Sequence, residues 1–129
     1  MNEKIINFNL ALSISTLLRM VCTYIGLDWK EFHFVREASD NSIVIGKNIA
    51  DSVAQAEVTI FGTTCVEAIN KYIFNEDNRV SLTDFKSRPR KDDRNKVDDF
   101  IIGVNGSSVE EMKKAFNNIE TFVSNKVSK

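Results

Sequence analysis

Near the start of the chain, apolar residues recur at steps of three and four positions. The run begins at Asn7 or Asn9, ends at Leu27, and passes through Leu10, Ile14, Leu17, Leu18, Val21 and Ile25. This spacing is typical of an amphipathic helix, and Gly26 near its end is a common helix terminator. The pattern therefore predicts a first helix over residues 7–27. Further apolar residues around its surface indicate that it lies deep in the core.

The pattern then changes to short runs rich in β-branched and aromatic residues. Residues 30–37 and 42–47 are two such runs, and four residues of turn character, 38–41, separate them. Runs of this kind joined by a short turn predict a β-hairpin.

The next stretch, residues 49–74, carries two conflicting signals. Asn48 can cap a helix, and apolar residues keep helical spacing from Ile49 to Phe74. Its interior, 58–64, is Val-Thr-Ile-Phe-Gly-Thr-Thr, which suits a strand and turn better than a helix. We interpret the stretch as one long or broken helix, and a strand inside it is the alternative.

The last third of the chain predicts a second hairpin and a final helix. Residues 79–86 and 97–104 alternate apolar and polar positions, so residues 86–99 contain the connecting loop. Ser107 and Glu110 have the spacing of a capping box, which starts a helix that continues to about Val127. Its apolar stripe is narrow, comprising Val109, Met112, Phe116, Ile119 and Val123. Packing on a sheet or contact with a partner would explain this stripe.

The predicted order is helix, hairpin, helix, hairpin, helix. This is an α+β fold in which an antiparallel sheet of about four strands packs with three helices. At 129 residues, with 43% hydrophobic and 27% charged residues, the chain is expected to be a single globular domain, not a disordered segment. The layout resembles that of small dimeric secretion chaperones, a likeness in element order that leaves room for a homodimer.

Residues 86–99 hold ten of the 35 charged side chains and the only proline of the chain. Six of the ten are basic and four are acidic, whereas the whole chain has a formal net charge of −1. Arginine forks bind carboxylates and phosphates in a planar geometry that lysine reproduces poorly. The segment is therefore the first candidate for a binding surface. The candidate partner-binding residues are Arg88, Arg90, Lys91, Asp92, Asp93, Arg94, Asp98 and Asp99.

Three roles fit this segment. Its mixture of signs suits a protein partner with a mixed-charge surface, with the basic residues meeting acidic groups and the aspartates meeting basic ones. A nucleic-acid-binding role for the Arg/Lys-rich loop 86–96 is less favoured, because the chain lacks the broad basic excess of such proteins. The simplest interpretation is a solvated loop that keeps the hairpin soluble.

An enzyme is the weakest hypothesis from the sequence. The chain has one histidine, His33, and two cysteines, Cys22 and Cys65, without the spacing of a zinc site, a disulfide framework or a catalytic constellation. It has no phosphate-binding glycine loop, so neither a metal nor a cofactor is expected. The remaining alternative is Cys65 as a reactive thiol, if the nearby Gly62 marks a helix start that lowers the thiol pKa.

Two cysteines in apolar runs favour a reducing compartment, so a cytoplasmic location is expected. Residues 5–27 contain a single charge, Arg19, which raises the question of a targeting or membrane segment. Arg19 and several interspersed polar residues make a buried core helix the better interpretation, with no membrane association. The sequence as a whole predicts a small non-enzymatic binding domain of the immunity, inhibitor or secretion-chaperone kind, which acts by occluding a partner protein.

Overall fold

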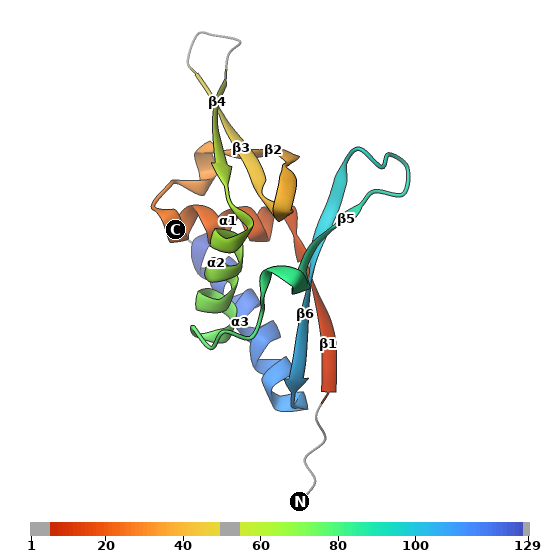
Figure 1. The fold of residues 1–129 in the computed structure, drawn as a ribbon. Coiled ribbons are helices and arrows are strands. Elements are labelled where there is room, and N and C mark those ends of the chain that lie inside the picture. Colours follow the sequence, from red (N-terminus) through yellow and green to blue (C-terminus); the bar gives the residue numbers. More distant parts are fainter. Residues whose placement is uncertain (1–5, 50–54, 128–129) are drawn as a thin grey trace, which may run out of the picture.

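The computed structural model describes residues 6–49 and 55–127 and arranges them as six strands and three helices (Figure 1). In chain order these are β1 (Ile6–Ser13), α1 (Ile14–Ile25), β2 (His33–Glu37), β3 (Ile43–Asn48), β4 (Gln55–Ile60), α2 (Gly62–Phe74), β5 (Phe85–Pro89), β6 (Val97–Ser107) and α3 (Val109–Val127). The strands form two antiparallel sheets, in the orders β1-β6-β5 and β2-β3-β4. The predicted α+β class and the three helices are confirmed. The single sheet of about four strands is wrong, because six strands form two separate sheets. β1 had been predicted as helix, and the strand that became β4 had been only the alternative for its segment.

The first correction concerns residues 6–13, which were predicted as helix and form β1. Burial alternates along this strand: Leu10 and Leu12 are buried, whereas Asn9 and Ala11 are exposed. The strand pairs with β6, with Leu10 opposite Ile102. Helix α1 starts only after Ser13, whose hydroxyl accepts a hydrogen bond from the Thr16 amide at 3.1 Å. Apolar residues repeat every two positions in the strand and every three to four in the helix. Across Ser13 the two repeats join with helical spacing, so the sequence predicted one helix.

The second correction concerns residues 49–74. Residues 55–60 form β4, which pairs with β3 and places Val58 opposite Ile45. Asn48, predicted as a helix cap, is the last residue of β3. Helix α2 begins at Gly62, where an added Cβ would collide with the Asp40 carbonyl oxygen and approach Leu82 to 2.7 Å. The strand alternative was therefore right for residues 55–60. The part of the predicted helix that falls on residues 50–54 lies outside the described residues.

The first hairpin is confirmed as β2 and β3, although the first strand begins at His33 because Trp29–Glu31 form a 3₁₀ turn. The second hairpin also needs corrections. Residues 79–84 of the predicted strand do not belong to one, since Leu82–Asp84 form a 3₁₀ turn and β5 begins at Phe85. Helix α3 is confirmed to Val127, but its capping box lies one residue later than predicted. Ser108 and Glu111 exchange the two hydrogen bonds of the box, at 3.2 and 3.1 Å. The earlier serine, Ser107, is a buried residue of β6.

One hydrophobic cluster draws on both sheets and all three helices. Phe100 of β6 stacks on Phe85 of β5 with ring centroids 5.1 Å apart, and Phe34 of β2 meets Phe100 edge-on at 6.4 Å. These three rings join the two sheets at the centre of the molecule. Among the described helices, none has the length and apolar character needed to cross a membrane.

A polar network fixes the segment between α2 and β5. Asn70, 5% exposed, accepts hydrogen bonds from the backbone amides of Arg79 and Val80 at 3.1 Å and donates one to the Val80 carbonyl at 3.0 Å. Arg79 in turn donates to Ser107 at 3.0 Å and to Glu111 at 2.9 Å. The hydrogen bonds from Arg79 lower the pKa of Glu111. The network therefore connects α2, the end of β6 and the start of α3.

We expect Asn70→Ala to lower the free energy of unfolding by about 3 kcal/mol, because it leaves two amides and a carbonyl without their partner. Urea denaturation followed by circular dichroism measures this change. Asn78→Ala, at an exposed position of the same segment, is the matched control and should change stability by less than about 0.5 kcal/mol. Equal losses in the two variants would contradict a structural role for the Asn70 side chain.

Candidate functional site

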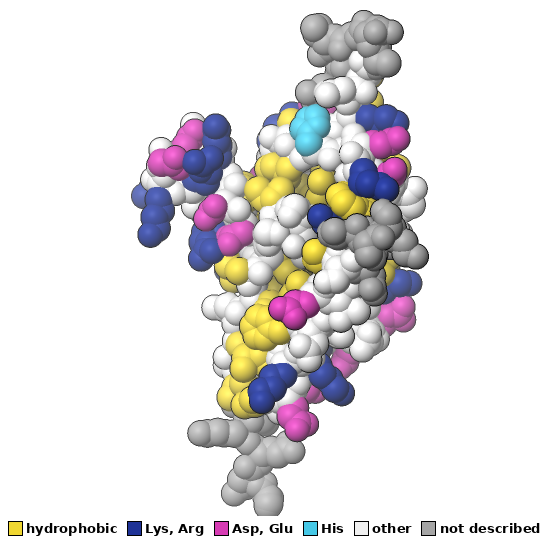
Figure 2. All heavy atoms as spheres, turned by 180° about the vertical axis from the view of Figure 1, so that it is seen from behind, with side chains coloured by type: hydrophobic (Ala, Val, Ile, Leu, Met, Phe, Trp, Pro, Cys, Tyr) yellow, Lys and Arg dark blue, Asp and Glu magenta, His cyan; other side chains and the backbone are white. Residues whose placement is uncertain are grey.

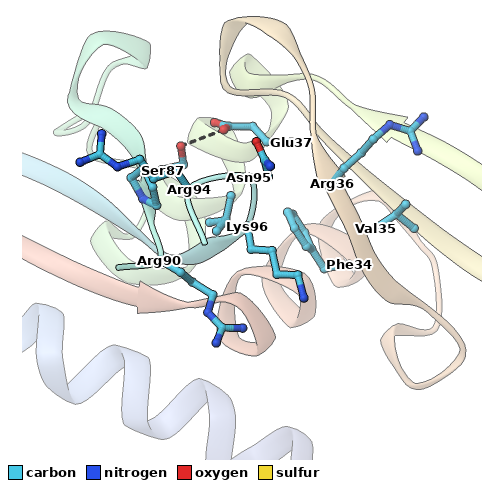
Figure 3. A pocket seen from close by; sticks show the side chains of 11 residues that line it. Phe34, Val35, Arg36, Glu37, Ser87, Arg90, Arg94, Asn95 and Lys96 are labelled. Atoms are coloured by element: carbon cyan, nitrogen blue, oxygen red, sulfur yellow. Dashed lines mark hydrogen bonds between the residues drawn. The ribbon is translucent and has the colours of Figure 1, made fainter. Parts of the chain in front are cut away.

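A groove of about 570 Å³ lies between β2 and the β5–β6 hairpin (Figure 3). Residues 34–37 of β2 form one wall, and the hairpin contributes Ser87, Pro89, Arg90 and residues 94–97 to the other. β2 and β5 are each at the edge of their sheet, so the groove lies between an edge strand of one sheet and an edge strand of the other. Edge strands can accept a further strand through their backbone groups.

The two walls are held together by one hydrogen bond and by the aromatic cluster. The Ser87 hydroxyl donates to a Glu37 carboxylate oxygen at 2.9 Å, and this contact is drawn across the groove in Figure 3. Phe34 of the β2 wall packs on Phe100, a fully buried residue of β6. The groove therefore has a fixed width at this point and an apolar surface beside it.

The cations that line the groove differ in whether they already have a partner. Arg36 extends away from the hairpin and pairs with Glu57 at 3.1 Å, and Arg90 pairs with Asp92 at 2.8 Å. Arg94 and Lys96 form no ion pair with any residue in the described ranges. Figure 3 shows Arg90 and Lys96 extending from the hairpin on the side where Phe34 lies. The groove thus combines unpaired positive charge with apolar surface.

The rest of the charged segment builds the hairpin. Arg88 and Asp99 face each other across β5 and β6, with two hydrogen bonds of 2.8 and 2.6 Å that raise the pKa of Arg88. In the loop, the Asp93 carboxylate accepts from the Asn95 amide at 3.0 Å. The Arg90 amide donates to the Lys96 carbonyl at 2.9 Å, which closes the loop. The loop itself covers residues 90–96, so it is shorter than the predicted segment.

The eight candidate partner-binding residues therefore fall into different surroundings. Arg88 lies in β5, Asp98 and Asp99 lie in β6, and the other five lie in the loop. Only two of the eight, Arg90 and Arg94, line the groove. Lys91, Asp92 and Asp98 are exposed away from it.

Sequence reasoning missed the β2 wall. Phe34 and Glu37 come about fifty residues before Ser87, and no local pattern relates them to the hairpin. The available signal was the charged pair Arg36-Glu37 at the end of an otherwise apolar strand, which marks a strand end outside the core. Their place in the groove follows from the packing of the two sheets.

The structure offers no support for catalysis by Cys65. Helix α2 does begin at Gly62, as that hypothesis required, but Cys65 is fully buried, and burial raises its pKa to about 12. Burial likewise raises the pKa of Cys22 to about 11. His33 is exposed at the start of β2. Within residues 6–49 and 55–127, no three histidine, cysteine or acidic residues are grouped as a metal site would require.

Comparisons with known proteins assign no family to the chain. No protein-family model, no curated protein and no solved structure matches it. The residues and geometry of the groove are therefore the basis for a proposed function.

We expect both thiols of the folded protein to resist alkylation by iodoacetamide at pH 7. The raised pKa values leave almost no thiolate, and burial blocks access, so the rate should be at least about 100-fold below that of the unfolded chain. Mass spectrometry of samples quenched over time, in buffer and in concentrated guanidinium chloride, measures both rates. Rapid modification of Cys65 in the folded protein would restore it as a candidate nucleophile.

Proposed function

We propose that the protein is a small non-enzymatic binding domain that holds an acidic, extended segment of a partner protein in the groove between β2 and the β5–β6 hairpin. By occupying that segment it would block the partner's other contacts, as immunity proteins, inhibitors and secretion chaperones do. The observation that carries the proposal is Lys96, which forms no ion pair among the described residues and extends from the hairpin on the side of the apolar Phe34 wall. Arg94, the second lining cation without an ion pair there, adds positive charge on the outer side of the hairpin.

The backbone supports an extended ligand. β2 has only β3 as a neighbour, and β5 has only β6, in the sheets formed by the described residues. A peptide strand can add to such an edge by main-chain hydrogen bonds, while pockets for its side chains supply selectivity. Phe34 and Val97 offer apolar surface to alternate side chains of such a ligand.

The charges support an acidic protein segment over a nucleic acid. Two arginines of the hairpin are neutralised by aspartates at 2.6 and 2.8 Å, which leaves few cations for a phosphate backbone. The aspartates that remain on the hairpin surface would repel phosphates but can accept lysine or arginine from a protein. A mixed-charge protein surface therefore fits the hairpin better.

The double variant Arg94→Glu/Lys96→Glu should weaken binding of an acidic peptide more than tenfold, or about 1.4 kcal/mol, because attraction becomes repulsion. The probe is a fluorescein-labelled peptide of alternating glutamate and valine, and fluorescence anisotropy measures its binding at low and at physiological salt. Neither side chain forms an ion pair within the described residues, so the variant should fold normally.

Lys91→Glu is the matched control, because Lys91 is exposed in the same loop but does not line the groove. It should change affinity less than about twofold. Arg88 is unsuitable for this test, because Arg88→Glu would place a glutamate opposite Asp99 and destabilise the hairpin. Equal effects of the control and the double variant, or tighter binding of a single-stranded or duplex oligonucleotide at low salt, would contradict the proposal.

A further inference from the structure

Strand β1 forms the edge of its sheet opposite to the edge at the groove. Its eight residues, Ile6–Ser13, pair with β6 on one side, and no other described strand lies beside them. The strand contains no charged residue, no proline and no glycine. Natural edge strands usually carry charges, prolines or bulges that prevent pairing with another chain. Apart from a register shift between Ile6 and Phe8, β1 has none of these devices.

The side-chain pattern of β1 is self-complementary. In antiparallel pairing about a two-fold axis, residues directly opposite each other lie on the same face of the sheet. The inner face of β1 carries Phe8, Leu10 and Leu12, and the outer face carries Asn9 and Ala11. In every two-fold register of two β1 strands, residues of the apolar inner face therefore lie opposite residues of the inner face. Residues of the uncharged outer face likewise lie opposite residues of the outer face. A charged residue on β1 would be repelled by the same residue of the second copy across the two-fold axis. β1 has no charged residue, so no such repulsion opposes the pairing.

The start of α3 lies near the Ile6 end of this edge, because Ser107, which pairs with Ile6, is two residues before Val109. Val109 and Phe116 of α3 are each 48% exposed, although they belong to the apolar side of that helix. Ile6 and Phe8 of β1 are only half-buried. Figure 2 shows hydrophobic side chains gathered in a band along the lower part of this face, over β1 and the start of α3. These side chains would be covered if the sheet continued past β1.

We propose that two copies of the chain associate through antiparallel pairing of their β1 strands, which joins two three-stranded sheets into one of six strands. The strand pair alone, roughly 27 Å long, is too small for a standard interface, so the flank of Val109 and Phe116 supplies the remaining buried surface. The second copy is the occupant that fits, because its strand has the same length, the same alternation and no charge. This interface uses no residue of the groove, so it does not depend on the proposed function.

Sedimentation equilibrium of the full chain, over about 1 to 100 µM, tests the proposal. The wild type should form a dimer of twice the 14.6 kDa chain mass. Asn9→Lys/Ala11→Lys places like charges opposite each other at two exposed positions, and so does Asn9→Glu/Ala11→Glu. Each variant should be monomeric by itself, with dissociation at least about tenfold more favourable than in the wild type. An equimolar mixture of the two should recover the dimer.

Lys86→Glu is the matched control, because Lys86 is exposed on β5, opposite Ile101, and β6 separates it from β1. It should leave the dimer intact, and circular dichroism verifies that every variant is folded. A wild type that stays monomeric at the highest concentration overturns the proposal. So does a dimer that survives in the lysine variant, or a mixture of the two variants that stays monomeric.

Discussion

The contact between Phe34 and Phe100 is the interaction on which the arrangement of this molecule depends. The chain builds two separate three-stranded sheets, and these two rings, 6.4 Å apart and nearly perpendicular, connect them. Phe100 is fully buried in the core, where it also stacks on Phe85. Such an aromatic pair contributes about 0.5–1.5 kcal/mol beyond the burial of its area. The groove beside β2 exists because this contact brings the two edge strands together while the hairpin projects past them.

The polar network of Asn70 and Arg79 also helps to position the β5–β6 hairpin, because it holds the segment that leads into β5. Residues 78–81 belong to no helix or strand, so the buried backbone groups of this segment need side-chain partners. Asn70 does this for Arg79 and Val80, which sets where the chain enters β5. Arg79 then ties this segment to Glu111 in the first turn of α3. The hairpin is therefore held at its base by hydrogen bonds and in its middle by aromatic packing.

The sequence predicts the fold class, the three helices, both hairpins and the charged loop, since each has a local pattern. It fails where two periods overlap, as at Leu10 and Ile14, which are four residues apart yet lie in a strand and in a helix. It also preferred a helix over β4, because the helical spacing of apolar residues outweighed the β-branched residues 58–60, which pair with β3. The charged loop of residues 90–96 can be predicted from its composition. The groove is not, because its other wall comes from Phe34 and Glu37, far away in the chain.

The two surfaces inferred for this protein are compatible because they occupy opposite edges of one sheet. β6 separates β1 from β5, so pairing through β1 leaves the β5 edge and its groove open. A dimer built in this way carries two grooves, related by the same two-fold axis. A partner with two acidic segments, or a dimeric partner, would bind both, and the second contact would form at a high effective concentration. A groove with only two unpaired cations, modest in affinity by itself, could then hold its partner firmly.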